Sequence, residues 1–162
     1  MAHHKRHNKN LRKHRYSASG HIYLVTTTCK ARAPVFENIE FGELVAQEIR
    51  RSDDEQRTRT FAYVVMPDHL HWLFQLQQHS SLSIVVQRIK GRSAHRINIL
   101  RKCSGAIWQP AYHEHTLRND ESLERVGNYV VANPVRGGIV SNLNDYPLWD
   151  LMWRRQQAEI RG

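Results

Sequence analysis

Two histidines separated by one residue stand in an apolar segment, VVMPDHLHWLF, at residues 64–74. In a β-strand successive side chains point to opposite faces, so His69 and His71 would share one face of the strand. The opposite face would be wholly apolar and would carry Leu70, Trp72, Phe74 and Leu76. The pattern therefore predicts a core strand with one buried face. Two imidazoles at positions i and i+2 of a rigid strand can bind one metal ion, and two ordinary polar side chains are the alternative.

A tyrosine and an asparagine lie four residues apart in RNDESLERVGNYVVANPVRGGIV, at residues 118–140. The segment predicts a helix that is capped by Asn119 or Asp120 and ends near Asn133, because Pro134 disfavours helical geometry in the residue before it. At about 100° per residue, Tyr129 and Asn133 fall together on one edge of the buried stripe. That stripe consists of Leu123, Val126 and Val130. The phenol and the amide could therefore meet at one place, although amphipathic packing and a simple helix stop are the alternatives.

The remaining elements follow from hydrophobic periodicity and turn residues. Strands are predicted at 21–28 and 61–66, and Pro67-Asp68 connects the second of these to the histidine strand as a hairpin. Helices are predicted at 41–51 and 81–100, where Gly91 weakens the longer one, and a looser extended segment follows at 106–117. The order β-α-β-β-α-β is typical of an α+β fold, a ferredoxin-like antiparallel sheet with helices on its faces. One more helix, at the C-terminal end, would carry Tyr129.

The chain length limits the possible domain organisation, and the net charge indicates the type of partner. The 162 residues are enough for one domain with a proper core, and we expect that domain at 17–162 behind a basic, flexible arm at 1–16. The formal charge of +9 fits an anionic partner, most simply nucleic acid. The arm holds six Lys and Arg residues and no acid, and no acid occurs between Asp68 and Glu114. A solvated basic face is the alternative interpretation of these runs.

Cysteine usage and hydropathy point to a reducing compartment without a membrane anchor. Only Cys29 and Cys103 are present and they form no CxxC pair, so a disulfide framework or a cysteine zinc site is not expected. No apolar run approaches the roughly 20 residues that span a bilayer, and no signal peptide is visible. We expect a protein of bacterial type in the cytoplasm, associated with the nucleoid.

Three motifs in order, PDHLHWLF, WQPAYHEHTLRN and YVVANPVRGGIV, resemble those of the REP-associated tyrosine transposases. These are single-tyrosine members of the HUH nucleases, where HUH means His-hydrophobe-His, and the resemblance covers about Arg15 to Tyr146. It implies that His69 and His71 are the metal-binding pair, Tyr129 the nucleophile and Asn133 the third metal ligand. His115 lies in a motif that the family also carries, without an assigned role. The segment SASGHIYL departs from the family, which often has a Gly-Gly pair there, so the target DNA sequence stays open.

The resemblance implies a metal-dependent endonuclease and strand transferase. Its substrate would be single-stranded DNA at a REP-like hairpin, and its intermediate a 5′-phosphotyrosine at Tyr129. The ion would be Mg²⁺ or Mn²⁺, with Mn²⁺ at least as effective because imidazoles suit softer ions. No small-molecule cofactor is expected, and the chain would act as a monomer or a homodimer.

Contacts to the DNA backbone are expected from basic residues of the arm and of the long helix, namely Arg12, Lys13, Arg15, Arg88, Lys90, Arg92 and Arg96. Trp108 or Tyr112 could stack on an unpaired base. Packing in the core is the alternative for both aromatic side chains.

Three rival interpretations are weighed against this one. A histidine-triad nucleotide hydrolase would need a third histidine at i+4, where this chain has Leu73. A non-catalytic nucleic-acid-binding module derived from the same fold would bind DNA without a covalent product. The second His-x-His pair, His113 and His115, competes for the metal but has less regular neighbours.

Overall fold

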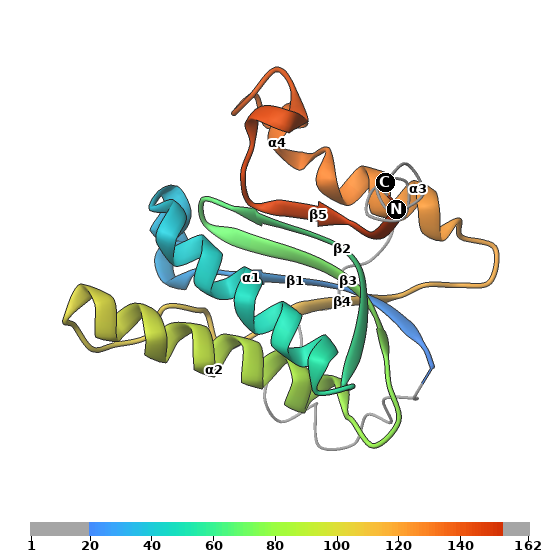
Figure 1. The fold of residues 1–162 in the computed structure, drawn as a ribbon, viewed down its shortest axis with the longest axis horizontal. Coiled ribbons are helices and arrows are strands. Elements are labelled where there is room, and N and C mark those ends of the chain that lie inside the picture. The colour runs from blue at the N-terminus through green and yellow to red at the C-terminus, as the bar shows by residue number, and fades with distance from the viewer. Residues whose placement is uncertain (1–19, 154–162) are drawn as a thin grey trace, which may run out of the picture.

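A five-stranded antiparallel sheet forms the centre of the structure, which is a computed structural model that describes residues 20–153 (Figure 1). The strands are β1 Ile22–Thr28, β2 Thr58–Met66, β3 His69–Leu76, β4 His113–Thr116 and β5 Trp149–Leu151, in the spatial order β4-β1-β3-β2-β5. The first four strands have the predicted ferredoxin-like arrangement, and the α+β class is confirmed. The predicted arm at 1–16 lies outside the described residues.

The helices divide between the two faces of the sheet. Helices α1 (Ile39–Asp54) and α2 (Leu82–Arg101) lie against each other on one face (Figure 1). Helix α3 (Leu123–Val131) and the short α4 (Asn133–Arg136) lie over the opposite face. Short 3₁₀ turns occur at Lys30–Arg32, Val35–Glu37 and Leu143–Asp145. The predicted strands at 21–28 and 61–66 and the first two helices are confirmed, with ends that move by up to three residues. Only His113–Thr116 of the predicted extended segment at 106–117 forms a strand.

Strand β3 shows why the two faces differ. Its residues Leu70, Trp72, Phe74 and Leu76 are all buried, and they face α1 and α2. Its other face carries both histidines and Leu73, and the cross-strand partner of Leu73 is Ala62 of β2, which in turn pairs with Leu151. Leu151 packs close to Gly127 of α3, so α3 covers the histidine face. The alternation predicted for this strand therefore separates a face buried in the core from the face that carries the two histidines.

Hydroxyl and amide side chains set the helix starts. Asn38 accepts the N–H of Glu40 at the start of α1, and Ser81 accepts the N–H of Ile84 at the start of α2. Helix α3 begins at Leu123 with Ser122 as its cap, so the predicted cap at Asn119 or Asp120 is wrong.

The later start of α3 has a local cause in the turn before it. The carboxylate of Glu121 accepts the backbone N–H of Arg118 and contacts the imidazole of His115, which holds residues 118–121 in a turn. The helix can therefore begin only after this turn.

The C-terminal part of the described chain adds a strand that the sequence did not predict. Strand β5 pairs with the outer edge of β2, and Leu148 accepts the backbone N–H of Val65 just ahead of it. The hydroxyl of Tyr146 donates to the carbonyl of Val65 at 2.5 Å. Burial raises the pKa of Tyr146 to about 12, which keeps this donor protonated. The added strand covers the otherwise open edge of β2.

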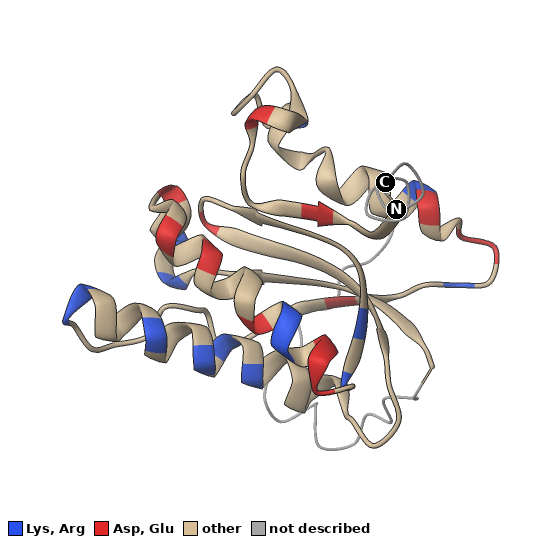
Figure 2. Ribbon diagram, viewed as in Figure 1, with Lys and Arg blue, Asp and Glu red and all other residues tan. Residues whose placement is uncertain are grey.

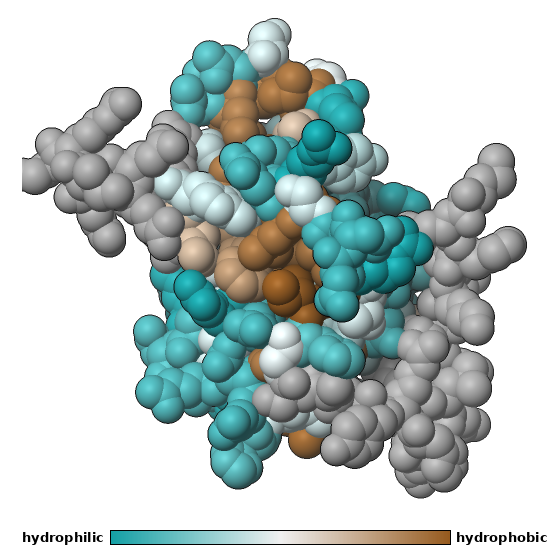
Figure 3. All heavy atoms as spheres, turned by 90° about the vertical axis from the view of Figure 1, so that its right-hand side faces the viewer, coloured by the Kyte–Doolittle hydropathy of each residue, from teal (hydrophilic) through white to brown (hydrophobic). Residues whose placement is uncertain are grey.

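Charge and hydropathy are unevenly distributed over the surface. Basic residues follow one another along α2, whereas acidic residues concentrate on α1 (Figure 2). On one side of the molecule, apolar side chains gather between hydrophilic regions (Figure 3). Among residues 20–153, no helix is long and apolar enough to cross a membrane.

Candidate active site

The two histidines of β3 face each other across a short gap. His69 and His71 are both half-buried, and their Nε2 atoms lie 3.1 Å apart. The rings meet at right angles, with centroids 4.8 Å apart. Strand pleating places both on the face covered by α3, as the sequence predicts. The two Nε2 atoms are therefore within hydrogen-bond distance of each other, close enough for one ion to contact both.

The Nδ1 atom of each imidazole is already occupied by a side chain. Asp68 contacts Nδ1 of His69 through Oδ1 at 2.6 Å, and Thr26 of β1 contacts Nδ1 of His71 through its hydroxyl at 2.9 Å. Thr26 lies directly opposite His71 in the β1–β3 register. Arg32 holds the second oxygen of Asp68 at 3.1 Å. Partners of this kind fix the ring orientation and leave Nε2 for a ligand.

The electrostatics of His71 suit a neutral imidazole that can act as a donor. Burial lowers the pKa of His71 to about 3, and the positive charges of His69 and Arg136 add to that effect. Burial alone would raise the pKa of Asp68, but hydrogen bonds from His69 and Arg32 outweigh it and hold that pKa below its usual value. At neutral pH Asp68 is therefore a carboxylate, and His71 is an uncharged ring with a lone pair.

Tyr129 lies near the C-terminal end of α3 with its ring largely in solvent, at 63% exposure. The buried residues of this helix are Gly127, Val130 and Val131. The predicted buried stripe is therefore only partly correct, because its members Leu123 and Val126 are only partly buried. Tyr129 was predicted at the edge of the buried stripe, but its ring is largely exposed. The guanidinium of Arg136 covers its ring at 3.7 Å from the centroid.

A break in the helix at Ala132 separates Tyr129 from Asn133, and Pro134 directly follows Asn133. The helix ends at Val131 rather than at Asn133, and α4 begins after a break at Ala132. Pro134 has no N–H to donate to the carbonyl of Val130 four residues earlier. The side-chain amide of Asn133 donates to that carbonyl at 2.7 Å in its place. This bond uses the NH₂ group of Asn133 and leaves the amide oxygen available.

Helix α4 lies beside the histidine row. Met66 is the direct cross-strand partner of His69, and its methyl group is 3.8 Å from the place where a Cβ on Gly137 would stand. Gly137 directly follows α4, and the charge of Arg136 acts on His71. The segment that holds Asn133 and Arg136 therefore belongs to the same side of the sheet as the histidine pair.

A divalent ion fits the donors present. Two Nε2 atoms converge, and the amide of Asn133 offers an oxygen, which is a mixed nitrogen and oxygen set suited to Mn²⁺ or Mg²⁺. Within residues 20–153 no cluster of three His, Cys, Asp or Glu side chains could hold a metal. If a metal binds at the histidine pair, a third ligand from this part of the chain would be a group of another kind, such as the Asn133 amide.

His115 has a structural partner. Its Nε2 lies 2.8 and 2.9 Å from the two carboxylate oxygens of Glu121, which ties β4 to the turn before α3. The N–H of Arg118 is the main cause that lowers the pKa of Glu121, and the contact with His115 contributes. His113 lies opposite Thr26, in the same cross-strand row as His71.

The basic residues of α2 that were predicted to contact DNA all have partners within the chain. Arg88 and Arg92 pair with Glu55 of the α1 end at 3.6 and 3.1 Å. Arg96 pairs with Glu48 at 3.1 Å, and Lys90 donates to the carbonyl of Gln109 at 2.5 Å. These side chains lie in the layer of α1 and α2, on the sheet face opposite the histidines. Arg12, Lys13 and Arg15 lie outside the described residues.

The aromatic residues proposed for base stacking are core residues. Trp108 is 5% exposed, its ring packs on Phe36 with centroids 5.2 Å apart, and its Nε1 donates to Ser93 at 3.0 Å. Tyr112 is buried as well. In this structure neither ring offers a face to a base, so the packing alternative holds for both.

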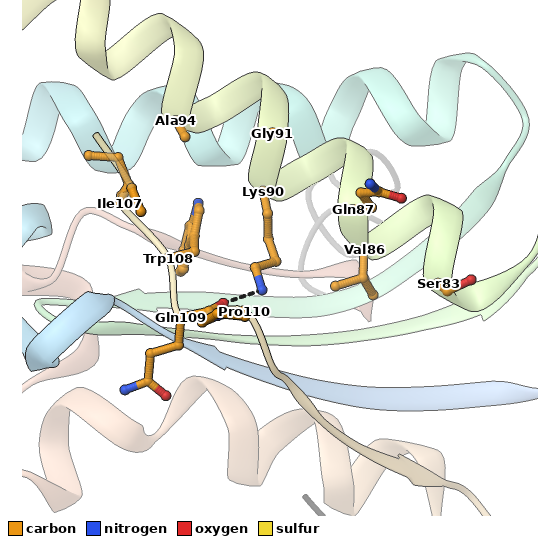
Figure 4. Close-up of a pocket in the computed structure, with 11 residues that line it drawn as sticks. Ser83, Val86, Gln87, Lys90, Gly91, Ala94, Ile107, Trp108, Gln109 and Pro110 are labelled. Atoms are coloured by element: carbon orange, nitrogen blue, oxygen red, sulfur yellow. Dashed lines mark hydrogen bonds between the residues drawn. The ribbon is translucent and has the colours of Figure 1, made fainter. Parts of the chain in front are cut away.

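A cavity of about 520 Å³ lies between α2 and residues 106–110 (Figure 4). Lys90 reaches across it from α2 to the carbonyl of Gln109, and Trp108 forms part of its wall (Figure 4). It belongs to the layer of α1 and α2 and contains none of the proposed metal ligands or the tyrosine.

Sequence reasoning missed three residues of the site, which are Thr26, Asp68 and Arg136. Asp68 directly precedes the histidine strand and could have been found as a carboxylate next to a candidate ligand. Thr26 depends on the β1–β3 register, which the sequence does not state. Arg136 depends on the break at Pro134, which brings a residue seven positions after Tyr129 back onto its ring.

Comparison with known proteins assigns this chain to a family. The chain belongs to the IS200-like transposase family, whose model matches residues 17–133. It is 25% identical over 134 residues to the REP-associated tyrosine transposase of Escherichia coli (strain K12), over 82% of this chain and 78% of that protein. A solved structure of a REP-associated tyrosine transposase bound to a REP hairpin matches the fold with a TM-score of 0.70. That match has 24% identity and covers 83% of this chain and 79% of the other. The resemblance inferred from the motifs is confirmed.

Proposed function

We propose that this chain cleaves and rejoins single-stranded DNA beside a REP-like hairpin, with Tyr129 as the nucleophile. The observation that carries the proposal is the convergence of the two Nε2 atoms of His69 and His71, 3.1 Å apart, on the sheet face that α3 and α4 cover. The family and a relative named for REP association support the same activity. The hairpin in the matching structure supports the choice of substrate. The place of action would be the DNA of a bacterial cytoplasm.

The covalent step can be written from the residues of this chain. The hydroxyl oxygen of Tyr129 attacks the scissile phosphorus in line, so the bond from Oη to phosphorus forms as the bond from phosphorus to the 3′ oxygen breaks. The phenol proton passes to solvent water, and the departing 3′ oxygen takes a proton to become a 3′-OH. The 5′ end then remains on Tyr129 as a phosphotyrosine. A later 3′-OH reverses the exchange and reseals the strand.

The Nε2 atoms of His69 and His71 and the amide oxygen of Asn133 would hold a divalent ion, Mn²⁺ or Mg²⁺. When bound, that ion supplies positive charge to the non-bridging oxygens of the phosphate. Asp68 and Thr26 keep the two imidazoles turned toward it by holding their Nδ1 atoms. Because two of the three donors are imidazole nitrogens, we expect Mn²⁺ to support cleavage at least as well as Mg²⁺.

The test is a covalent trap. Labelled hairpin DNA with a single-stranded flank, taken from repeats beside the protein's own gene, is incubated with protein and Mn²⁺ or Mg²⁺ and then run on a denaturing gel. We expect a labelled protein–DNA band for the wild type and none for Tyr129→Phe, which keeps the ring and loses only the hydroxyl.

Mass spectrometry of the digested adduct should place the nucleotide on Tyr129. Tight binding of the same hairpins without a covalent band, in either metal, would instead support a non-catalytic DNA-binding module.

A further inference from the structure

Arg136 makes two contacts with one residue, Tyr129. Its guanidinium carbon lies 3.7 Å from the centroid of the phenol ring, which is a close cation–π stack. Its Nη1 also donates to the backbone carbonyl of Tyr129 at 2.7 Å. One contact holds the side chain and the other holds the backbone, so the pair is fixed at both ends.

The break in the helix is what makes this double contact possible. Residues seven apart lie on one face of a continuous helix but two turns apart along its axis, about 10 Å. The interruption at Ala132, followed by Pro134, makes α4 a separate short helix, and from it the side chain of Arg136 reaches the Tyr129 carbonyl of α3. Near the same break, Asn133 and Arg136 donate to the carbonyls of Val130 and Tyr129.

Tyr129 needs such a contact because its ring is largely exposed within the described residues 20–153. The ring is 63% exposed, and an exposed side chain samples several rotamers in solution. A nucleophile must keep its oxygen in line with the bond that breaks, and a misplacement of about 1 Å can cost a hundredfold in rate. Planar stacking of a guanidinium restricts the ring without covering the hydroxyl, which must stay open to DNA.

We propose that Arg136 is a positioning residue that fixes the phenol ring of Tyr129 for in-line attack through its stack on the ring and its bond to the Tyr129 carbonyl. The proposal rests on the proposed function, since it assigns Arg136 to the same reaction. A lysine keeps the charge but has neither the plane nor the fork of a guanidinium, and it cannot make both contacts in the same way.

The test compares three variants in single-turnover formation of the covalent adduct, each over a range of hairpin DNA concentrations. Arg136→Met removes the charge and the plane, and Arg136→Lys restores the charge alone. Arg125→Met is the matched control because Arg125 is an exposed arginine of α3, four residues before Tyr129, and its loss removes the same charge nearby.

We expect Arg136→Met to lower the rate at saturating DNA by about 10- to 100-fold, with a smaller change in the half-saturating concentration. Arg136→Lys should recover only part of that rate, and Arg125→Met should keep it. A normal saturated rate for Arg136→Met with a raised half-saturating concentration would make Arg136 a phosphate contact and overturn the proposal. Equal losses in Arg136→Met and Arg125→Met would overturn it too.

A spectroscopic readout tests the stack without DNA or metal. In NMR spectra of the full chain, the Nε–H and Cδ–H₂ signals of Arg136 should be shifted upfield by the ring current, and the shift should vanish in Tyr129→Leu. An unshifted Arg136 in the wild type would overturn the proposal while leaving cleavage by Tyr129 intact. A wild type that forms no covalent adduct would overturn the proposed function and this assignment together.

Discussion

At the scale of single residues, the site depends on what holds the histidines rather than on the histidines alone. The sequence could predict that His69 and His71 share a face, because alternation along one strand requires only local information. It could not predict their orientation, because the partner of His71 is Thr26, 45 positions away and set by strand register. The pairing of Tyr129 with Arg136 was hidden for a similar reason, since it follows from a break in the helix.

The hydrogen bonds to the Nδ1 atoms of His69 and His71 lead to a prediction about metal affinity. In the non-cleaving Tyr129→Phe background with hairpin DNA bound, Asp68→Asn should weaken Mn²⁺ binding by about 10-fold or more, because the anionic partner of His69 is lost. Thr26→Val should weaken it less, since a neutral hydroxyl is removed from His71. The decrease of the free Mn²⁺ signal in electron paramagnetic resonance titrations measures both.

The control for this experiment is Thr28→Val, the same change two residues along the same face of β1 and opposite His69. It should leave Mn²⁺ affinity unchanged. If Asp68→Asn binds Mn²⁺ as tightly as the unaltered protein, Asp68 does not act on the ion through His69.

At the scale of elements, the strands and long helices were predictable and their junctions were not. Ser81 and the periodic apolar residues after it identify α2 almost to the residue. The start of α3 was misplaced because the acids that suit a helix start are used differently, with Glu121 bound to His115. Strand β5 was missed because only three residues form it, and they become a strand through pairing with β2.

Replacing each of two helix glycines with alanine should change the free energy of unfolding in opposite directions. A Cβ on Gly42 of α1 would stand 2.3 Å from Cδ1 of Leu148, which is buried and cannot easily move aside. Gly42→Ala should therefore lower the free energy of unfolding by about 1–3 kcal/mol through overpacking. Gly91→Ala in α2 meets no atom within 4 Å and should raise it by about 0.5–1 kcal/mol, as expected for a helix interior.

Urea titrations followed by circular dichroism measure both glycine variants. Leu148→Ala combined with Gly42→Ala serves as the control, because it removes the clashing methyl groups and should cancel part of the overpacking. A Gly42→Ala variant as stable as the wild type would mean that α1 and the segment before β5 are less tightly packed than described.

At the scale of the whole molecule, the charge of +9 indicated an anionic partner but not which face would meet it. Composition identifies α2 as basic, yet the contacts of that helix depend on α1 packing beside it. Glu48 and Glu55 of α1 are placed where Arg88, Arg92 and Arg96 can pair with them. A sequence separation of about 40 residues hides such pairing, so the sequence could not show that these basic residues have acidic partners within the chain.

Arg96 should accordingly matter for stability. Glu48 is 2% exposed, and Arg96→Met would leave its carboxylate buried without that cation. The free energy of unfolding should fall by about 1–3 kcal/mol, and adding Glu48→Gln should restore part of it. Denaturant unfolding measures the change in the free energy of unfolding. Binding of hairpin DNA at two salt concentrations then distinguishes a role in stability from a contact with DNA. A loss of affinity and of salt dependence without a loss of stability would show that Arg96 contacts phosphate instead.

The exposure of Tyr129 also bears on the fate of the strand after cleavage. The proposed phosphotyrosine would form on a ring that is 63% exposed, so within residues 20–153 no closed chamber would protect the ester from water. The choice between rejoining and hydrolysis then becomes a competition between two nucleophiles, water and a strand end. A base-paired hairpin that keeps the 3′-OH close raises its effective concentration and favours rejoining. Under the proposed function, fidelity would thus be supplied by the folded DNA.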